Sequence, residues 1–568
     1  MIIQPIVNIA EICAQHNIDQ AVISPGSRSA PITLAFARHP KIKTFVIPDE
    51  RSSGFIALGL AQSSKKPVVV VSTSGTAVVN LYPAIIEAFY QEVPLIILTA
   101  DRPPEWIDQQ DGQTIRQQNI FQNHVLGSFQ FPLSFEDEEA RWHGEKMISE
   151  AILKATGTTQ GPVHINIPIR EPFYPSPEEE YHYSSHIKVI KSTKAIHQPG
   201  DYWHADFMES LKNFNKIMVV TGQTRISTEL NICLNNIQKK LKWVIIGDII
   251  ANIDGLDHSI TTHDVILSDI AESSSLAPDL LITFGHSILS KSLKNFLRNE
   301  DISAHWHIGC GTDTIDAFKS LTQKIEVEPE IFFHIIEKQH KASNNSQIKY
   351  FNHWVEKDLQ SRSFIKEYFL IENFSEFHAV EKVIGNLPAA CNLHLANSMP
   401  VRYANYISLE KKQKITVWSN RGTSGIDGCL STMVGHAINT NQLNVLLIGD
   451  VAFFYDRNGL WHNHLPKNLR IIILNNHGGG IFRLINGPKQ LDELEEYFET
   501  KQRLNAANTA RDFGIKYFSV KNIEALPAIL HQFFDKNTGP SILEIETDPK
   551  CNQQVYEDFK HKAAKLWQ

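Results

Sequence analysis

Paired cysteines, long apolar runs and a basic charge excess are all missing from this sequence of 568 residues. Its six cysteines are scattered singly, without a C-x-x-C pair, so we expect neither a zinc ribbon nor a disulfide framework and interpret the cysteines as packing residues. No uninterrupted apolar run reaches about 18 residues, the length that a membrane span requires, and the N-terminal segment lacks the basic flank and apolar core of a signal peptide. We therefore expect a cytoplasmic protein with no stable membrane insertion.

The charge balance is acidic, with 54 Lys and Arg against 62 Asp and Glu and a net charge of −8 at pH 7. Without a basic face the protein cannot neutralise a row of phosphates, so we expect no nucleic-acid partner. Three enzyme motifs are also missing: no G-x-G-x-x-G follows a strand, no Walker A lysine loop is present, and no G-x-S-x-G elbow follows a strand. These absences argue against a dinucleotide fingerprint, a P-loop and a serine hydrolase.

What the sequence does contain is typical of large globular cores, with 42% apolar and 20% charged residues. At about 150–200 residues per domain, the length predicts about three domains. Short apolar runs alternate with helical stretches, which is the pattern of βαβ units and parallel sheets. The sequence predicts an α/β fold of three consecutive α/β domains with mostly parallel sheets, at residues 1–180, 181–345 and 346–568. A Pro-rich, acidic stretch at residues 171–185 is the predicted linker. The predicted strands lie within residues 20–26, 43–50, 66–75, 92–104, 161–169, 216–223, 242–250, 279–285, 304–309, 391–398, 414–422, 444–450, 469–476 and 541–548.

Two predicted strands of the third domain run directly into polar residues. Asp450 ends one of them, and Asn475 and Asn476 end the next, with room for one α/β crossover between. Neighbouring parallel strands would present these oxygens at one edge of the sheet, where ligands of α/β proteins bind. Such hard ligands suit Mg²⁺, which is usually held by one or two carboxylates together with substrate phosphates, so a diphosphate ligand is implied. Gly449 would let backbone amides approach those phosphates, and the helix that follows would add its positive end.

Glu50 stands at a comparable position in the first domain, at the end of a strand and immediately before an amphipathic helix. Asp49 already provides an acid at the start of that helix, where a negative charge complements the helix dipole.

The G-D and N-N pairs, with a glutamate in a separate α/β domain, resemble thiamine diphosphate enzymes. The segments "SPGSRSAP", "DERSSGFIALGLA", "TSGTAVVNLYPAIIEA", "TADRPPE", "QTIRQ" and "SNRGTSGIDGCLST" are similar to those of the 2-succinyl-5-enolpyruvyl-6-hydroxy-3-cyclohexene-1-carboxylate synthases of menaquinone biosynthesis. The resemblance spans both outer domains, whereas the middle domain contributes less. It implies a thiamine diphosphate-binding fold and a transferase that decarboxylates 2-oxoglutarate and adds the resulting succinic semialdehyde carbanion to isochorismate.

The resemblance also implies the cofactor contacts. Mg²⁺, or Mn²⁺ in its place, is expected on Asp450, Asn476 and the carbonyl of Gly478. Glu50 is the expected catalytic residue, because a carboxyl group on the pyrimidine ring favours the imino tautomer that removes the thiazolium proton. Ile426 is expected under the cofactor, which it holds bent. The full set of expected cofactor-binding residues is Glu50, Ser419, Ile426, Gly449, Asp450, Val451, Ala452, Asn476, Gly478 and Ile481.

Both implied substrates carry two carboxylates, which arginine binds in bidentate fashion. The family pattern places Ser398 and Arg402 on the distal carboxylate of 2-oxoglutarate. The residues expected around isochorismate are Ser27, Arg28, Arg102, Gln113, Lys291 and Arg421, with Ile481 and Ile485 as an apolar wall. Val451 departs from the third glycine of the general G-D-G signature, and Ser292 stands where some relatives have arginine. The resemblance further implies a homodimer or a dimer of dimers with active sites at the subunit interface.

Three other interpretations remain. An acetohydroxyacid synthase or a simple 2-oxoacid decarboxylase would share Asp450, Asn476 and Glu50, although neither needs as many arginines and simple decarboxylases commonly carry a His-His pair that this sequence lacks. A non-enzymatic α/β scaffold with a bound Mg²⁺-diphosphate is the second. A zinc site at His462 and His464 is the third, and it is disfavoured because residues two apart on a helix point to different faces.

Overall fold

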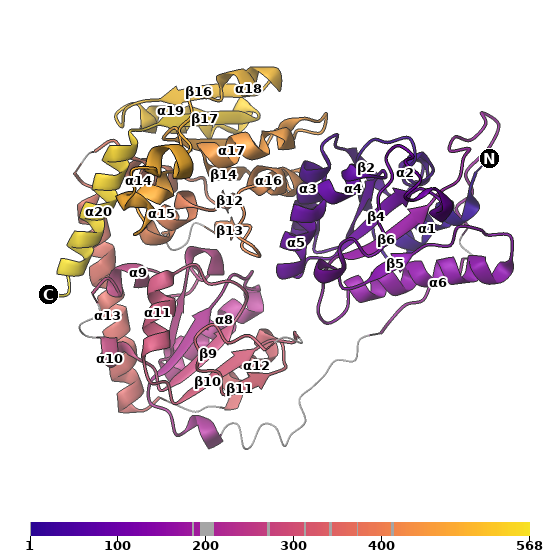
Figure 1. The fold of residues 1–568 in the computed structure, drawn as a ribbon. Helices are drawn as coiled ribbons and strands as arrows, with labels where there is room; N and C mark the ends of the chain where they lie inside the picture. Colours follow the sequence, from indigo (N-terminus) through magenta and orange to yellow (C-terminus); the bar gives the residue numbers. More distant parts are fainter. Residues whose placement is uncertain are drawn as a thin grey trace. The chain divides into compact units, whose positions relative to one another are not determined.

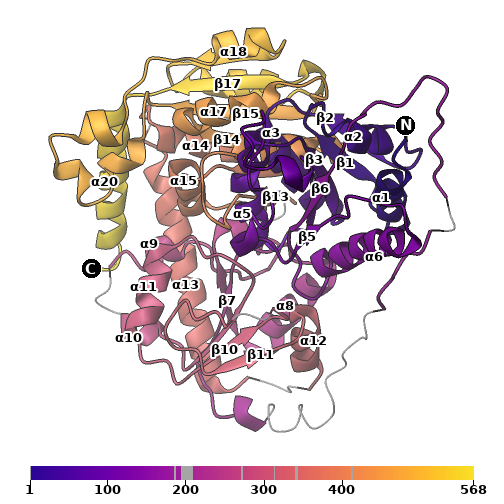
Figure 2. The ribbon, with the colours of Figure 1, turned by 45° about the vertical axis from the view of Figure 1, so that its right-hand side comes forward.

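The computed structural model describes residues 2–184, 187–193, 209–269, 273–311, 314–339, 343–371, 373–410 and 414–568 (Figures 1 and 2). The chain divides into two compact units. The first comprises Met1–Ala195, Asn420–Asn441 and Ala452–Leu469, and the second comprises Ile196–Ser419, Gln442–Val451 and Arg470–Gln568. Residue 185, at the end of the predicted linker, lies outside the described residues. Among the described helices, none has the length and apolar character needed to cross a bilayer.

The first unit is built on a six-stranded sheet in the order β2-β1-β3-β4-β6-β5, in which all neighbouring strands are parallel. Its central strands are buried on both faces, as expected of β-branched runs in a parallel sheet covered by helices. The strands are β1 (Gln20–Ile23), β2 (Lys43–Val46), β3 (Val68–Ser72), β4 (Leu95–Asp101), β5 (Ser128–Gln130) and β6 (Val163–Pro168). The helices are α1 (Gln4–Gln15), α2 (Ala30–Ala37), α3 (Glu50–Ser64), α4 (Thr76–Asn80), α5 (Tyr82–Tyr90), α6 (Glu138–Ala155) and α16 (Cys429–Asn439), with short turns η1 (Pro104–Trp106), η2 (Gln122–His124) and η4 (Arg457–Leu460).

The second unit contains two sheets, a five-stranded one in the order β11-β10-β9-β7-β8 and a six-stranded one in the order β13-β12-β14-β15-β17-β16. The strands of the five-stranded sheet are β7 (Ile217–Thr221), β8 (Val244–Gly247), β9 (Leu280–Phe284), β10 (Ala304–Ile308) and β11 (Gln323–Ile325), and all of their pairings are parallel. Those of the six-stranded sheet are β12 (Asn392–Leu395), β13 (Thr416–Trp418), β14 (Asn444–Gly449), β15 (Leu469–Asn475), β16 (Lys516–Val520) and β17 (Ser541–Glu546).

Helices pack around both sheets of the second unit. Around the five-stranded sheet these are α8 (Thr228–Leu241), η3 (Ile249–Ala251), α9 (His263–Ile266), α10 (Ser273–Leu276), α11 (Lys291–Asn299), α12 (Pro329–Gln339) and α13 (Asn345–Tyr368). Around the six-stranded sheet these are α14 (Glu376–Gly385), α15 (Met399–Ile407), η5 (Gly480–Arg483), η6 (Pro488–Gln490), η7 (Leu494–Phe498), α18 (Ala507–Asp512), α19 (Leu526–Phe533), η8 (Lys536–Thr538) and α20 (Pro549–Lys565). Helix α17 (Asp450–Asp456) begins in the second unit, and its residues from Ala452 onwards belong to the first.

The three sheets confirm the predicted α/β architecture with mostly parallel sheets. All fourteen predicted strand segments contain a strand, whereas β5, β11 and β16 were not predicted. Each of these three lies at an edge of its sheet, where partial exposure replaces the continuous apolar run with mixed residues. The domain boundaries at residues 180 and 345 stay predictions.

Strand order fixes where ligands can reach each sheet. In the six-stranded sheet of the second unit, β12 pairs with β13 on one side and with β14 on the other. The strand order therefore reverses between β12 and β14. Loops diverge at such a switch point and leave a crevice beyond the carboxyl ends of the strands. The loops that follow β12, β14 and β15 therefore surround the position where the sequence places its polar residues.

Two glycines bring α3 and α16 into close contact within the first unit. A Cβ atom on Gly59 would lie 2.0 Å from the carbonyl oxygen of Thr432, and one on Gly435 would lie 2.1 Å from that of Ile56. Backbone packs directly on backbone here. The "SGFIALGLA" segment therefore needs its second glycine for helix packing.

Replacing Gly435 with alanine should destabilise the first unit by about 1–3 kcal/mol, because the added methyl group forces α3 and α16 apart. The midpoint of thermal unfolding followed by circular dichroism measures the effect. Gly385→Ala is the matched control, since a Cβ atom at this helix position meets nothing within 4 Å. Equal midpoints for the two variants would contradict the close approach.

Candidate active site

Asp450 and Asn476 lie at neighbouring strand ends, as predicted. Asp450 follows β14 and begins α17, while Asn476 follows β15, the next strand of the sheet. Ser398 follows β12, on the other side of the switch point, with φ of 74°. A positive φ is strained for serine, and strained backbone is characteristic of functional sites.

The carboxylate of Asp450 is almost fully buried, at 1% exposure. Burial raises its pKa to about 6, although Gln502 Nε2 donates to Oδ2 over 2.7 Å and backbone N–H groups of Val451 and Gly478 also donate. A buried carboxylate without a basic partner is costly, and a cation would relieve that cost.

Asn476 offers a free oxygen beside this carboxylate. Its Nδ2 donates to Glu376 Oε1 over 2.7 Å, which fixes the amide orientation. Its Oδ1 is buried and has no hydrogen-bond partner among the described residues. Since buried polar atoms are nearly always satisfied, the orphaned oxygen fits a ligand to a cation.

Glu376 was missed by the sequence analysis. It is the first residue of α14, after the cap Ser375, and an acid at this position is common in helices of any function. Burial, followed by the charge of Asp450, raises its pKa to about 7. The contact that gives it a role, with Asn476, joins residues a hundred positions apart.

The glycines of this edge fit the expected diphosphate and metal. A Cβ atom on Gly478 would lie 2.8 Å from the carbonyl oxygen of Glu499, so the turn admits only glycine. A Cβ atom on Gly449 would meet nothing within 4 Å, which leaves open space beside the backbone. The residues of this edge therefore suit Mg²⁺ and a phosphate group.

The other expected cofactor residues lie in less distinctive surroundings. Ser419 Oγ donates to the carbonyl oxygen of Leu395 over 2.7 Å, so its hydroxyl proton is already engaged. Val451 is half-buried in the second unit. Ala452 and Ile426 belong to the first unit, where Ala452 is buried and Ile426 is half-buried in the loop before α16.

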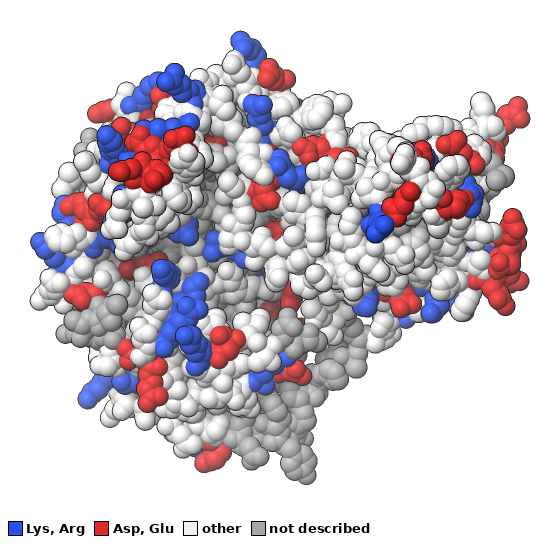
Figure 3. Space-filling view, in the orientation of Figure 1, with Lys and Arg blue, Asp and Glu red and all other residues white. Residues whose placement is uncertain are grey.

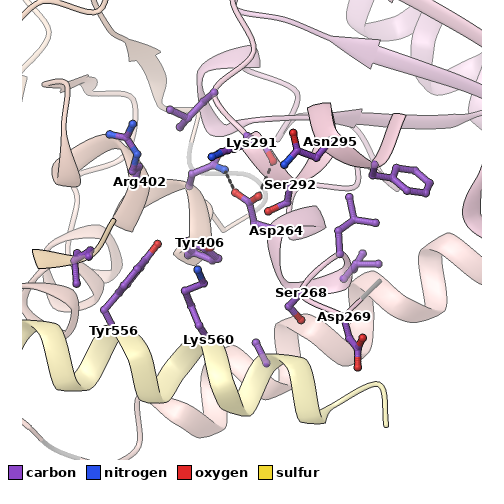
Figure 4. A pocket seen from close by; sticks show the side chains of 18 of the residues that line it. Asp264, Ser268, Asp269, Lys291, Ser292, Asn295, Arg402, Tyr406, Tyr556 and Lys560 are labelled. Atoms are coloured by element: carbon purple, nitrogen blue, oxygen red, sulfur yellow. Dashed lines mark hydrogen bonds between the residues drawn. The ribbon is translucent and has the colours of Figure 1, made fainter. Parts of the chain in front are cut away.

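A cavity of about 1060 Å³ in the second unit brings together four of the predicted substrate residues (Figure 4). These are Lys291, Arg402, Ile481 and Ile485. Arg402 and Lys291 lie in the upper part of Figure 4, and Ser268 and Asp269 lie in the lower part. Ser398 does not line the cavity, but its carbonyl oxygen accepts a hydrogen bond from Arg402 Nη1. Ser292, where some relatives have arginine, also lines it.

Arg402 is more buried than Lys291, the other cation among these four residues. Burial lowers the pKa of its guanidinium, an effect opposed by the nearby Tyr556, Asp264 and Tyr406. No carboxylate forms an ion pair with Arg402 among the described residues. An anionic ligand would supply the missing partner.

A buried network joins the helices that carry Lys291 and Arg402. Asp248, after β8, accepts hydrogen bonds from the backbone N–H groups of Leu289 and Ser290, and its Oδ1 accepts from Asn405 Nδ2 over 3.3 Å. Asp264 accepts from Ser290 Oγ over 2.6 Å and from Asn405 Nδ2 over 2.8 Å. Two carboxylates therefore fix the start of α11 relative to α15. Neither was predicted, because each acts through residues distant in sequence.

The first unit holds Glu50 at the first position of α3. Asp49 caps this helix by accepting hydrogen bonds from the backbone N–H groups of Arg51 and Ser52. Burial, together with the adjacent charge of Asp49, raises the pKa of the half-buried Glu50. The carboxyl of Glu50 makes no side-chain hydrogen bond with the described residues and is open to a ligand.

Arg28 follows β1 of the same unit and is buried without a carboxylate partner in the part of the chain that the structure describes. Its Nη1 donates to the carbonyl oxygen of Ile169 over 2.7 Å, and its guanidinium lies 4.7 Å from the ring centroid of Phe173. Ser27 is exposed and lies 3.1 Å from the hydroxyl of Tyr174. An unpaired buried guanidinium is suited to bind an anion.

The remaining predicted site residues differ in their exposure and in the contacts that they already make. Arg102 is already paired with Asp111, at 3.1 Å between Nε and Oδ2. Gln113 is exposed and lies against Gly75, whose Cβ would come within 3.2 Å of the Gln113 Cα. Gln117 was missed: its Oε1 accepts from the backbone N–H of Gly75 over 2.9 Å, which ties the "QTIRQ" segment to the loop after β3. Arg421 is half-buried in the loop before α16.

The expectation that His462 and His464 lie on a helix is wrong. They follow η4 in a turn, where the backbone N–H of His464 donates to His462 Nδ1 over 3.0 Å and His462 Nε2 contacts the carbonyl oxygen of Gly459. Both rings are engaged by the chain itself, in keeping with a packing role.

Charged residues of both signs are interspersed on the face shown in Figure 3, and uncharged surface predominates where the residues are described.

Three family models match the chain in order. They describe thiamine pyrophosphate enzymes (thiamine pyrophosphate is thiamine diphosphate): the N-terminal TPP binding domain matches residues 8–125, the middle domain residues 195–395, and the C-terminal TPP binding domain residues 398–545. The expected thiamine diphosphate-binding fold is thereby confirmed.

Several curated relatives align over nearly the whole chain, and those described here carry the name 2-succinyl-5-enolpyruvyl-6-hydroxy-3-cyclohexene-1-carboxylate synthase. A protein from Cytophaga hutchinsonii is 44% identical, with 98% of each chain covered. One from Flavobacterium johnsoniae is 38% identical, with 97% of each chain covered. One from Bacteroides fragilis is 34% identical, with 98% of each chain covered.

The buried His263 gives the network at α11 a dependence on pH. Burial lowers the pKa of His263, but its hydrogen bond to Asp248 and the charges of Asp264 and Asp358 outweigh this, so the pKa is raised. A raised pKa stabilises the fold fully below the unfolded value of about 6.5, and this contribution is lost as pH rises through the folded value.

Replacing His263 with glutamine should therefore cost most stability at about pH 6 and progressively less towards about pH 9. Thermal midpoints of wild type and variant across this range measure the difference. Replacing the exposed His531 in the same way is the control and should leave the profile unchanged. A difference that stays constant or grows with pH would contradict a charged His263.

Proposed function

The chain belongs to the 2-succinyl-5-enolpyruvyl-6-hydroxy-3-cyclohexene-1-carboxylate synthase family of thiamine diphosphate enzymes, and from that premise we propose the reaction and the residues that perform it. The reaction is decarboxylation of 2-oxoglutarate and addition of the remaining four-carbon unit to isochorismate, with release of carbon dioxide. The observation that carries this proposal is the orphaned Asn476 Oδ1 beside the buried Asp450 carboxylate, a pair that suits a metal-bound diphosphate. The names of the relatives support the synthase over the decarboxylase and acetohydroxyacid synthase alternatives.

Bound thiamine diphosphate supplies the carbon nucleophile and the electron sink that decarboxylation of a 2-oxoacid requires. Asp450, Asn476 and the carbonyl of Gly478 bind Mg²⁺, or Mn²⁺ in its place, and Glu376 keeps the Asn476 oxygen turned towards the metal. Open backbone at Gly449 and the start of α17 accommodate the phosphates.

Glu50 acts on the pyrimidine ring of the cofactor. Its pKa is raised and its carboxyl makes no side-chain hydrogen bond with the described residues, so it would be able to share a proton with a ring nitrogen. Ile426, Ser419, Val451, Ala452 and Ile481 complete the proposed cofactor contacts. Glu50 and Asp450 belong to different units, and we propose that two chains pair so that each cofactor contacts both a first domain and a last domain.

Arg402 and Arg28, which form no ion pair with a carboxylate among the described residues, are the central cations of the proposed substrate site. Arg402, with Ser398, binds the distal carboxylate of 2-oxoglutarate at the cavity of the second unit. Arg28, Ser27, Arg102, Gln113, Lys291 and Arg421 surround isochorismate, and Ile481 and Ile485 provide the apolar wall. Arg102 would have to exchange Asp111 for the substrate.

The assembly state, the domain boundaries and the location stay predictions. We expect a homodimer or a dimer of dimers in the cytoplasm, with domains at residues 1–180, 181–345 and 346–568. Sedimentation of the purified protein with thiamine diphosphate and Mg²⁺ tests the assembly, and a stable monomer with full activity would rule out a shared site.

Glu50→Gln should lower turnover about 10²–10⁴-fold, because the amide cannot exchange a proton with the pyrimidine ring. The measurement is carbon dioxide release from 2-oxoglutarate with isochorismate, thiamine diphosphate and Mg²⁺ present. Glu136→Gln, at an exposed loop position of the same unit, is the control. Unchanged turnover in the Glu50 variant with unaltered folding would remove Glu50 from the mechanism.

Arg402→Gln should raise the KM for 2-oxoglutarate about 10–100-fold, since hydrogen bonds to charged groups contribute about 1.5–3 kcal/mol. The KM for isochorismate should change far less. The exposed Arg511, replaced in the same way, provides the comparison. A defect confined to isochorismate would assign Arg402 to the other substrate.

A further inference from the structure

Two helices on the five-stranded sheet of the second unit present metal-binding side chains to each other. α8 and α12 pack together and lie side by side in both views (Figures 1 and 2). Cys233 lies on α8, and His334 and Glu337 lie on α12. One sulfur, one ring nitrogen and one carboxylate oxygen of these residues all lie within 4.8 Å of one another.

We propose that Cys233, His334 and Glu337 bind a borderline-soft divalent cation of the Zn²⁺ class, with water at the remaining position. This site is separate in sequence and in fold from the Mg²⁺ ligands proposed after β14 and β15. Its three donor types are those of tetrahedral zinc sites, whereas Mg²⁺ prefers an all-oxygen set.

Helix geometry gives the site its shape. His334 and Glu337 are three residues apart, so their side chains lie on the same face of α12. That face is turned towards α8, because the neighbouring Phe333 and Ile336 pack in one core cluster with Leu234 and Ile237 of α8. Cys233 is 5% exposed at the edge of this cluster, which gives the sulfur a dry, fixed position.

The present contacts leave a place for the cation. The Cys233 sulfur and a Glu337 carboxylate oxygen lie within 4.8 Å of each other, close enough for one metal ion to bind both. Asn236 Nδ2 donates to Glu337 Oε1 over 2.7 Å and orients the carboxylate, as supporting residues of metal sites commonly do. The imidazole of His334 is exposed and makes no hydrogen bond with the described residues.

One positive charge competes with the metal. Lys240 Nζ lies 4.0 Å from Glu337 Oε1, and its side chain is mostly exposed, so it can turn into solvent when a cation binds. The bound ion would join α8 to α12, the last helix before α13. Because only the folded unit presents all three ligands, the ion should stabilise this sheet and its helices.

Co²⁺ is the probe that distinguishes this site from the oxygen site. Untagged full-length protein, free of thiamine diphosphate and with Mg²⁺ in excess, is titrated with Co²⁺ while absorption is recorded. A thiolate-to-cobalt charge-transfer band reports a bound cysteine, which an oxygen-only site cannot produce. We expect the band to saturate near one Co²⁺ per chain.

Variants assign the band to these residues. Cys233→Ser should abolish it, whereas Cys551→Ser, at a half-exposed cysteine of α20, should leave it intact. His334→Gln removes an exposed ligand with little risk to the fold and should weaken Co²⁺ affinity more than about tenfold. His561→Gln, at an exposed position of α20, is its control.

Zn²⁺ supplies an independent readout, since it should raise the thermal midpoint of wild type more than that of His334→Gln. Absence of the charge-transfer band in wild type, or its persistence in Cys233→Ser, would overturn the proposal. An equal Zn²⁺ shift in wild type and His334→Gln would overturn it as well.

Discussion

A buried carboxylate and a buried amide oxygen, Asp450 and Asn476, lie at the ends of the neighbouring strands β14 and β15, and neither forms an ion pair with a described lysine or arginine. Parallel pairing places both at one edge of the sheet, and the reversal of winding between β12 and β14 opens that edge. Burial raises the pKa of Asp450 to about 6, because it disfavours the charged form of the carboxyl. The arrangement is accounted for when a metal ion and its diphosphate are part of the working protein.

The surrounding residues act mainly by fixing positions. Glu376 orients the Asn476 amide by accepting a hydrogen bond from its nitrogen, which leaves the oxygen for a ligand. Asp248 and Asp264 join the start of α11 to α15 and thereby set Lys291 and Arg402 at one cavity. The five-stranded sheet, for which the sequence showed no ligand motif, therefore helps to shape this cavity through hydrogen bonds to backbone and amide groups. Its helices α8 and α12 carry the further metal site proposed above.

Local sequence patterns predict the buried strands and the polar residues at their ends. Buried strands such as β15 read directly as apolar runs, and strand ends such as Asp450 and Asn476 read as polar interruptions of those runs. The strands β5, β11 and β16 were not predicted, because edge strands are partly exposed and lack the continuous apolar run of a buried strand. Glu376, Asp248 and Gln117 were not predicted either, because their roles come from hydrogen-bond partners far away in the chain. The roles given to Arg402 and Glu50 came from the family resemblance. Among the described residues, Arg402 has no carboxylate partner and the Glu50 carboxyl makes no side-chain hydrogen bond.

The central claim is that Asp450 and Asn476 recruit the cofactor through a divalent metal. Thiamine diphosphate binding, followed by the quenching of tryptophan fluorescence with and without Mg²⁺, tests it most directly. The account predicts tight binding that requires Mg²⁺ in wild type, and an affinity more than about tenfold weaker in Asn476→Ala but not in Asn386→Ala, an exposed position at the end of α14. Equal, metal-independent binding by wild type and Asn476→Ala would contradict it.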